Sequence, residues 1–199
     1  MNSDPFAAFG LEPGPMVDLA ALKEHFARAT AASHPDKFAQ AAEAERAEAE
    51  ERYATLNRAY QTLIDPVQRL LTLYVMTNGE KPRDVQRIPP GTMDLFIEVG
   101  QACQQLDQYL EKRRNMTGRL ERATLMTEEL TLQDVLVQLR MKLEALGAKL
   151  DYDLAALDDR WRAGAKDLRV LETLYRKYSY LARWRQQLEE REVALMTEG

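Results

Sequence analysis

The sequence predicts an all-α protein built from two helical parts. Helix-forming Ala, Leu, Glu, Gln, Arg and Met dominate most of the chain, and β-branched residues do not alternate with polar ones as they would in strands. Glycine and proline concentrate at 10–15 and again at 78–91, where they interrupt the helical pattern. We therefore expect an N-terminal helical hairpin domain over 1–77, a linker over 78–91 and a C-terminal helical bundle over 92–199.

The composition excludes several classes of protein. Of the 199 residues 45% are hydrophobic, enough for a core, and no apolar run is long enough to cross a membrane. With 27 basic and 32 acidic residues the net charge is −5, which argues against nucleic-acid binding. The start of the chain carries no secretion signal and Cys103 is the single cysteine, so we expect a cytoplasmic protein without disulfides, metal or cofactor.

Apolar spacing near the N-terminus predicts an antiparallel pair of helices. Asp18 is suited to cap the first helix, which Ser33-His34-Pro35 should end, because proline disfavours a helical conformation in the residue before it. The second helix has apolar residues at 4-3-4-3 spacing and should end at Asp65-Pro66, where proline can begin a third helix. The loop of the hairpin would then display residues 34–38.

Three further seams of apolar residues predict a three-helix bundle. The seams are Leu95, Val99, Ala102, Leu106 and Tyr109; Leu132, Leu136, Leu139, Leu143, Leu146 and Leu150; and Leu171, Leu174, Tyr178, Leu181 and Leu188. Polar breaks at 115–118 and 158–159 are expected to separate the helices. A coiled-coil dimer would show the same spacing, so the oligomeric state and the relative orientation of the two parts stay open.

The tripeptide His34-Pro35-Asp36 is the most informative feature of the chain. Proline restricts the backbone of the loop, and a carboxylate held at the tip of a helical hairpin can form a charge-assisted bond with an arginine of a partner protein. We expect Asp36 to make that bond and His34 to position the loop. The alternative is an ordinary turn in which His34 and Asp36 cap helix ends. A metal site would need more ligands than these and His25, the other histidine.

In this context the N-terminal part resembles the J-domain, the module through which co-chaperones engage DnaK-type chaperone ATPases. The resemblance rests on 34–37 and on the segment Asn57-Arg58-Ala59-Tyr60-Gln61-Thr62-Leu63-Ile64-Asp65-Pro66. It implies that the loop stimulates ATP hydrolysis by such a chaperone.

The resemblance also implies that basic residues on the helix before the loop dock on an acidic surface of the chaperone. The last turns of that helix here read Ala29-Thr30-Ala31-Ala32-Ser33. The positive charges available are those of Lys23, His25, Arg28 and Lys37. We therefore expect weaker electrostatic steering than is usual for a J-domain.

The layout of the whole chain resembles the HscB-type co-chaperones of iron–sulfur cluster assembly. Further likenesses are Pro66-Val67-Gln68-Arg69-Leu70-Leu71, Gln104-Gln105-Leu106-Asp107, and the segments 176–181 and 187–190. The resemblance implies a non-enzymatic co-chaperone that binds a DnaK/HscA-type chaperone and delivers an IscU-type iron–sulfur scaffold protein to it. Because one chain carries both contacts, client and ATPase would meet in an intramolecular event.

A helical wheel indicates a binding surface on the first bundle helix. The face opposite the buried seam holds Met93, Phe96, Ile97, Gly100, Gln101, Gln104 and Gln108. Three large apolar residues on an outer face predict a contact surface. The resemblance implies that this surface binds the scaffold protein, with Tyr180 of the last helix as a further aromatic contact. Packing of Met93, Phe96 and Ile97 against the linker or the hairpin domain is the alternative.

Amides occupy this face where the HscB-type pattern carries several glutamates. Gln101, Gln104 and Gln108 retain hydrogen bonding but remove charge pairing with a basic scaffold. Either scaffold binding is more apolar here, or the protein is a J-domain adaptor for a different client, with the bundle serving interaction or oligomerisation. An enzyme is the least supported function, since the sequence offers no phosphate loop, paired metal ligands or activated nucleophile. Cys103 is expected to be an inert, partly buried thiol.

Overall fold

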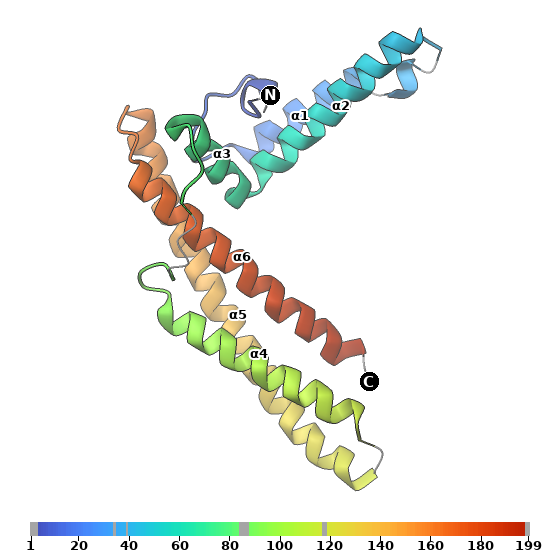
Figure 1. Ribbon diagram of the computed structural model, residues 1–199, viewed down its shortest axis with the longest axis vertical. Coiled ribbons are helices and arrows are strands. Elements are labelled where there is room, and N and C mark those ends of the chain that lie inside the picture. Colours follow the sequence, from blue (N-terminus) through green and yellow to red (C-terminus); the bar gives the residue numbers. More distant parts are fainter. Residues whose placement is uncertain (1–3, 34, 39, 84–87, 117–118, 198–199) are drawn as a thin grey trace. The chain divides into compact units, whose positions relative to one another are not determined.

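The helices predicted from the apolar spacing are present in the computed structural model, which describes residues 4–33, 35–38, 40–83, 88–116 and 119–197 (Figure 1). Within these ranges the chain forms six α-helices and two short 3-10 helices, with no strand. In chain order they are η1 (Ala7–Phe9), α1 (Leu19–Ala32), η2 (Pro35–Phe38), α2 (Glu43–Ile64), α3 (Pro66–Asn78), α4 (Met93–Arg114), α5 (Arg119–Arg162) and α6 (Leu168–Thr197). The all-α prediction is confirmed.

The chain divides into two compact units. The N-terminal unit consists of Met1–Arg83 together with Asp153–Tyr175, and the bundle unit consists of Asp84–Tyr152 together with Arg176–Gly199. The turn between α5 and α6 therefore belongs to the N-terminal unit. The division expected at 78–91 did not assign this turn to the N-terminal unit, because the bonds that join α5 to that unit come from residues 13–16, far away in the sequence.

Helix ends in the N-terminal unit follow the predicted caps. The Asp18 carboxylate accepts hydrogen bonds from two backbone N–H groups in the first turn of α1. Asp65 ends α2 and caps α3, where its carboxylate accepts the N–H of Val67 at 2.7 Å. Pro66 occupies the first turn of α3, where its missing N–H costs no helical hydrogen bond.

Aromatic packing joins α1 to α2. The two helices lie side by side and run in opposite directions (Figure 1). The ring of Phe26 on α1 stacks on that of Tyr60 on α2, with centroids 4.1 Å apart, and Phe9 of η1 meets Phe26 edge-on. Leu22 and Leu63 are fully buried beside them. This packing holds the hairpin and places η2 at its far end.

A buried arginine connects three segments of the N-terminal unit. Arg69 of α3 is only 7% exposed. Its Nε donates to the carbonyl of Pro15 at 3.0 Å, and its Nη1 donates to the carbonyl of Leu63 at 2.5 Å. A buried charge is costly unless it is hydrogen-bonded, so these bonds fix the segment before α1 and the end of α2 against α3.

The end of α5 is held by the segment that precedes α1. The Asp158 carboxylate accepts the N–H of Met16 at 3.0 Å and the Nε–H of Arg162 at 2.6 Å. The indole N–H of Trp161 donates to the carbonyl of Pro13 at 3.3 Å. Asp158 and Trp161 are both buried as a result.

One predicted helix break is wrong and the other is confirmed. The structure continues α5 past Asp158-Asp159 to Arg162, and the turn that follows contains Gly164 at φ +92°. Asp158 lies inside the helix because its carboxylate has a backbone partner from another segment. The break at 115–118 is confirmed, since α4 ends at Arg114 and α5 begins at Arg119.

The bundle unit is held by the three predicted seams. Every predicted seam residue is buried except Leu95 and Leu146, which are half-buried. Arg191 of α6 binds Asp107 of α4 through two hydrogen bonds of 2.9 and 2.7 Å. A third hydrogen bond, from Arg113 to the carbonyl of Leu195, also joins α4 to α6.

We predict that Asp158→Ala destabilises the protein by about 1–3 kcal/mol, because it leaves the Met16 N–H without its acceptor. Urea denaturation of the full chain measures the change. Asp159→Ala is the matched control, since Asp159 is exposed on the same helix and its loss should change stability by less than about 0.5 kcal/mol. Equal effects of the two substitutions would contradict the assignment of Asp158.

Candidate functional site

The loop between α1 and α2 is the first candidate site. Its backbone forms η2, which contacts α2, and the N–H of Ala41 donates to the carbonyl of Phe38 at 3.0 Å. Phe38 is half-buried, whereas Lys37 is exposed at the tip. The local geometry is therefore a tight turn in which Phe38 is half-buried and the preceding residue is available to a partner.

The structure describes three of the predicted loop residues only in part or not at all. His34 is outside the described residues. Pro35 and Asp36 contribute their backbone to η2, but their side chains are outside the described part of the chain. Their predicted roles in chaperone binding stay predictions.

Positive charge is sparse on α1. Lys23 and Arg28 lie on its exposed face, as expected, beside Glu24 and several alanines. His25 is half-buried, and its Nδ1 lies 3.1 Å from the carbonyl of Phe9. Because a carbonyl can only accept, Nδ1 carries the hydrogen, and His25 serves to hold η1 on α1. The structure therefore gives His25 a contact with η1 that the sequence did not predict.

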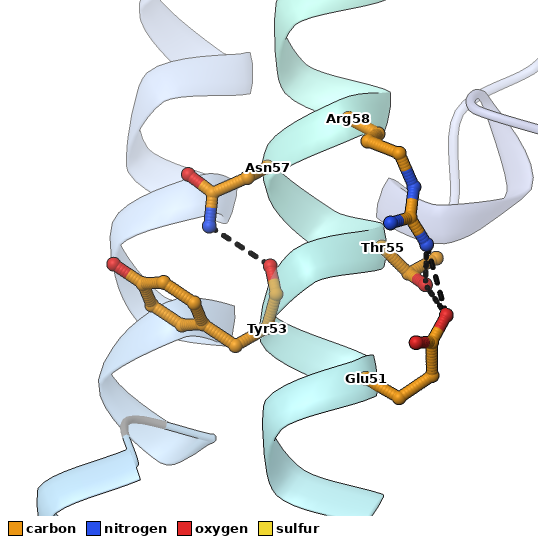
Figure 2. A network of polar contacts seen from close by, with 5 residues as sticks. All are labelled: Glu51, Tyr53, Thr55, Asn57 and Arg58. Carbon is orange, nitrogen blue, oxygen red and sulfur yellow. Dashed lines mark hydrogen bonds and ion pairs between the residues drawn. The ribbon is translucent and has the colours of Figure 1, made fainter.

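Residues of the 57–66 motif hold the hairpin together. Ala59 and Leu63 are buried between the helices. Asn57 lies on the same side of α2 as Tyr53, and its Nδ2 donates to the carbonyl of Tyr53 at 2.8 Å (Figure 2). The motif thus shapes the scaffold on which the loop is displayed.

A polar network lies on the opposite side of α2. Arg58 Nη2 donates to Glu51 Oε1 and to Thr55 Oγ1, both at 2.9 Å (Figure 2). The side chains of Arg58 and Glu51 are 65% and 74% exposed, so solvent screens the ion pair and it adds little stability. Its main consequence is that Glu51 offsets the charge of Arg58 on this face.

The outer face of α4 is the second candidate site. We name it the α4 surface and define it by the predicted residues Met93, Phe96, Ile97, Gly100, Gln101, Gln104 and Gln108, all of which are exposed. The three large apolar side chains at its start, Met93, Phe96 and Ile97, are 52%, 43% and 48% exposed. These fractions argue against the alternative that they pack beneath the described linker residues 88–91 of the same unit.

Two acidic residues beside the α4 surface are paired with other helices of the bundle. Glu98 accepts an ion pair from Lys142 of α5 at 2.6 Å. Asp107 is bound by Arg191 of α6, as described above. The seven residues of the α4 surface are themselves uncharged. A partner on this face therefore meets apolar and amide groups, with the exposed carboxylate of Asp94 at their edge.

Tyr180 of α6 lies level with the start of the α4 surface. The pairs that join Asp107 to Arg191 and Arg113 to Leu195 occur in the same order on both helices, so α4 and α6 run parallel (Figure 1). Phe96 and Tyr180 each precede the Asp107–Arg191 pair by eleven residues, which is about three helical turns. The register thus puts the two residues at about the same height along their helices.

The side chain of Tyr180 is half-buried. Its ring lies 5.5 Å from that of the buried Trp184, and the guanidinium of Arg183 lies 5.8 Å from the Tyr180 ring. Trp184 therefore holds this aromatic pair in the core, while Tyr180 is partly exposed at the side of the bundle.

A second exposed apolar stripe escaped the sequence prediction. Met126, Leu130, Val137 and Met141 of α5 are 52–68% exposed. Their spacing of four, seven and four residues puts them on one face of the helix, which we name the α5 stripe. The signal was present in the sequence but was hidden by the stronger leucine seam on the opposite side of α5.

The interior of the bundle offers no sign of reactive chemistry. Cys103 is half-buried, and burial raises the pKa of its thiol, as expected for an inert cysteine. Among the residues with described positions, no three His, Cys, Asp or Glu side chains are grouped as metal ligands would be. Across the same residues, no helix combines the length and the apolar character that a membrane span needs.

Tyr109 fixes α4 to α5 on the buried side of the bundle. Its ring is 1% exposed, and its hydroxyl donates to Glu129 Oε2 at 2.6 Å. Burial, assisted by this hydrogen bond, raises the pKa of Tyr109 to about 12. The protonated form is therefore the one that the fold stabilises.

Comparisons with known proteins agree with the predicted resemblance. No family model matches the sequence. The co-chaperone protein HscB homolog of Shewanella halifaxensis is 45% identical over 71 residues, which are 34% of this chain and 41% of that protein. The match thus spans less than half the length of this curated relative.

Two solved structures share the fold over nearly the whole chain. Human co-chaperone protein HscB has a TM-score of 0.65 at 17% identity, over 96% of this chain and 82% of that one. Chaperone HscB from Vibrio cholerae has a TM-score of 0.61 at 24% identity, over 95% and 98% respectively. The chain is therefore similar to HscB-type co-chaperones in fold throughout and in sequence over about a third of its length, and the predicted resemblance is confirmed.

We predict that the stability of the fold falls between pH 10 and pH 12 through Tyr109. The folded pKa lies above the ordinary value of 10.0, so its contribution is complete below pH 10 and is lost as the pH rises through about 12. Urea denaturation across this range should show a shallower pH dependence for Tyr109→Phe than for the parent. Tyr152→Phe is the control, because Tyr152 is 76% exposed. Identical slopes for Tyr109→Phe and the parent would contradict the assignment.

Proposed function

We propose that this chain is an HscB-type co-chaperone that stimulates the ATPase of a DnaK/HscA-type chaperone and presents an IscU-type iron–sulfur scaffold protein to it. The observation that supports the first half is the tight turn that the backbone of 35–38 forms between two packed antiparallel helices. The loop would engage the chaperone in the cytoplasm, and we infer no catalytic step for this chain itself.

The chaperone contact is proposed to depend on a single charged bond. Asp36 would bind an arginine of the ATPase, and Pro35 would limit the entropy that the loop loses on binding. Lys23, Arg28 and Lys37 would add long-range attraction to an acidic chaperone surface. Because Glu24 lies among them, association should depend only weakly on salt.

The scaffold contact is proposed for the α4 surface, with Tyr180 at its edge. Its support is the exposure of Met93, Phe96 and Ile97, since three large apolar side chains on one outer face mark a protein contact more often than plain solvent-facing surface. Gln101, Gln104 and Gln108 would supply hydrogen bonds around this apolar centre. Because both contacts belong to one chain, the scaffold and the ATPase would meet at a high effective concentration.

Asp36→Asn should abolish stimulation of ATP hydrolysis, because the amide keeps the shape of the side chain but loses the charge that binds arginine. Steady-state ATP turnover by a purified DnaK/HscA-type chaperone measures the effect. Glu48→Gln, the same change at an exposed position of α2, is the matched control and should stimulate like the parent. Full stimulation by Asp36→Asn would remove the proposed chaperone contact, while circular dichroism checks that the variant stays folded.

Phe96→Ala and Ile97→Ala should each weaken binding of a purified IscU-type scaffold protein by about tenfold, because each removes apolar area from the contact. Titration calorimetry measures the dissociation constants. Val137→Ala and Met141→Ala on the α5 stripe are matched controls, since they remove similarly exposed apolar side chains.

The pattern of losses separates the two candidate functions. Weakening only by the α4 variants supports the proposal, and weakening only by the α5 variants would move the scaffold contact to the α5 stripe. A parent protein that does not bind the scaffold at all would favour an adaptor for a different client.

A further inference from the structure

Gly100 interrupts the α4 surface without a structural reason inside the chain. It lies in the interior of α4 and has no positive φ angle, so no turn requires it. A Cβ built at this position meets no described atom within 4 Å. Glycine is among the poorest helix formers, and alanine would fit here with better helix propensity. The chain therefore keeps a residue that weakens α4 at the centre of its exposed face.

The other glycine inside a bundle helix shows what such a residue does in this protein. A Cβ at Gly147 of α5 would lie 2.8 Å from Nη2 of Arg185 and 3.6 Å from Cδ2 of Leu181. Glycine at 147 thus makes room for side chains of α6. Gly100, by contrast, lies on the exposed face of α4, where no described atom comes within 4 Å of a Cβ built on it.

The neighbours of Gly100 turn this space into a notch. On a helix the residues three and four positions away surround a given position, so Phe96 and Ile97 lie on one side of Gly100 and Cys103 and Gln104 on the other. Phe96 and Ile97 are about half exposed, so their side chains stand beside the bare backbone of Gly100.

The charge around the notch favours an apolar occupant. None of its four neighbours carries a charge, and the pKa of the Cys103 thiol is raised, which keeps it neutral. Glu98 and Asp107, the acids on either side of Gly100 along α4, are paired with Lys142 and Arg191. A charged side chain would lose its hydration here without gaining a partner.

We propose that the notch at Gly100 receives one large apolar side chain of the scaffold protein, which approaches the α4 backbone between Phe96 and Gln104. This inference rests on the proposed function and specifies its contact. The scaffold would present an apolar segment with uncharged flanks. Binding would depend on shape and apolar burial and would be insensitive to salt.

The test uses opposite effects of one substitution on stability and binding. Gly100→Ala should raise the Tm of the full chain by about 2 °C, because alanine favours the helix and meets no neighbour. The same methyl group should weaken binding of a purified IscU-type scaffold protein by about tenfold, because it overfills the contact. Gly100→Leu should abolish binding. A general loss of folding cannot produce weaker binding together with a higher Tm.

Matched controls and salt complete the experiment. Ala182→Leu adds bulk at an exposed position of α6 and should leave the dissociation constant unchanged. The parent affinity should change by less than about threefold between about 0.05 and about 0.5 M salt.

Each of four other outcomes would contradict the inference, and each has a different meaning. Unchanged scaffold binding by Gly100→Ala, with a parent that binds, removes the notch and leaves the proposed function intact. A lower Tm for Gly100→Ala would give Gly100 a structural role inside the chain. A dimeric parent that becomes monomeric in Gly100→Leu would make a second copy of this chain the occupant. No binding by the parent would remove both the notch and the scaffold contact.

Discussion

Burial of one apolar face on each helix is the constraint from which the rest of the structure follows. The stacking of Phe26 on Tyr60 joins α1 to α2, and the leucine seams join α4, α5 and α6. When these apolar faces are packed, the loop at the end of the hairpin and the outer face of α4 remain accessible to partners. The residues that could act in binding are therefore those that the cores do not use.

The two units handle charged residues in different ways. In the N-terminal unit, Arg69 and Asp158 are buried and bonded to backbone groups of distant segments, so each one fixes a particular chain path. In the bundle unit, pairs such as Glu98 with Lys142 are partly exposed and contribute little to stability. Their effect is to offset charge beside the α4 surface. Buried charged residues thus fix the chain path in the N-terminal unit, whereas partly exposed ion pairs reduce the charge beside the α4 surface in the bundle unit.

Most of the fold could be predicted from the sequence because its signals are local. Caps such as Asp18 and Asp65 act within one helical turn, and an apolar seam shows directly which side of a helix is buried. The position of the turn after α5 could not be predicted in this way. Two consecutive aspartates are typical of a loop, but Asp158 lies inside α5. Its carboxylate there accepts a backbone N–H that is 142 residues away in the sequence.

The candidate sites were predictable to different degrees for the same reason. The apolar spacing predicted the α4 surface, because the face of the helix opposite the buried seam is exposed. It could not show that the space beside Gly100 is empty, or that Tyr180 stands level with Phe96, because both depend on the register between helices. The structural role of His25 was hidden as well, since it depends on the position of the Phe9 carbonyl.

The order in which the chain is synthesised gives the contact of Asp158 a further consequence. Residues 1–83 leave the ribosome long before 153–175, yet both belong to one compact unit. The nascent hairpin can pack Phe26 on Tyr60 as soon as α2 emerges, but the N–H of Met16 and the carbonyl of Pro13 must wait for Asp158 and Trp161. Folding of the N-terminal unit is thus completed only after most of the bundle has been translated, which ties maturation of the first unit to synthesis of nearly the whole polypeptide.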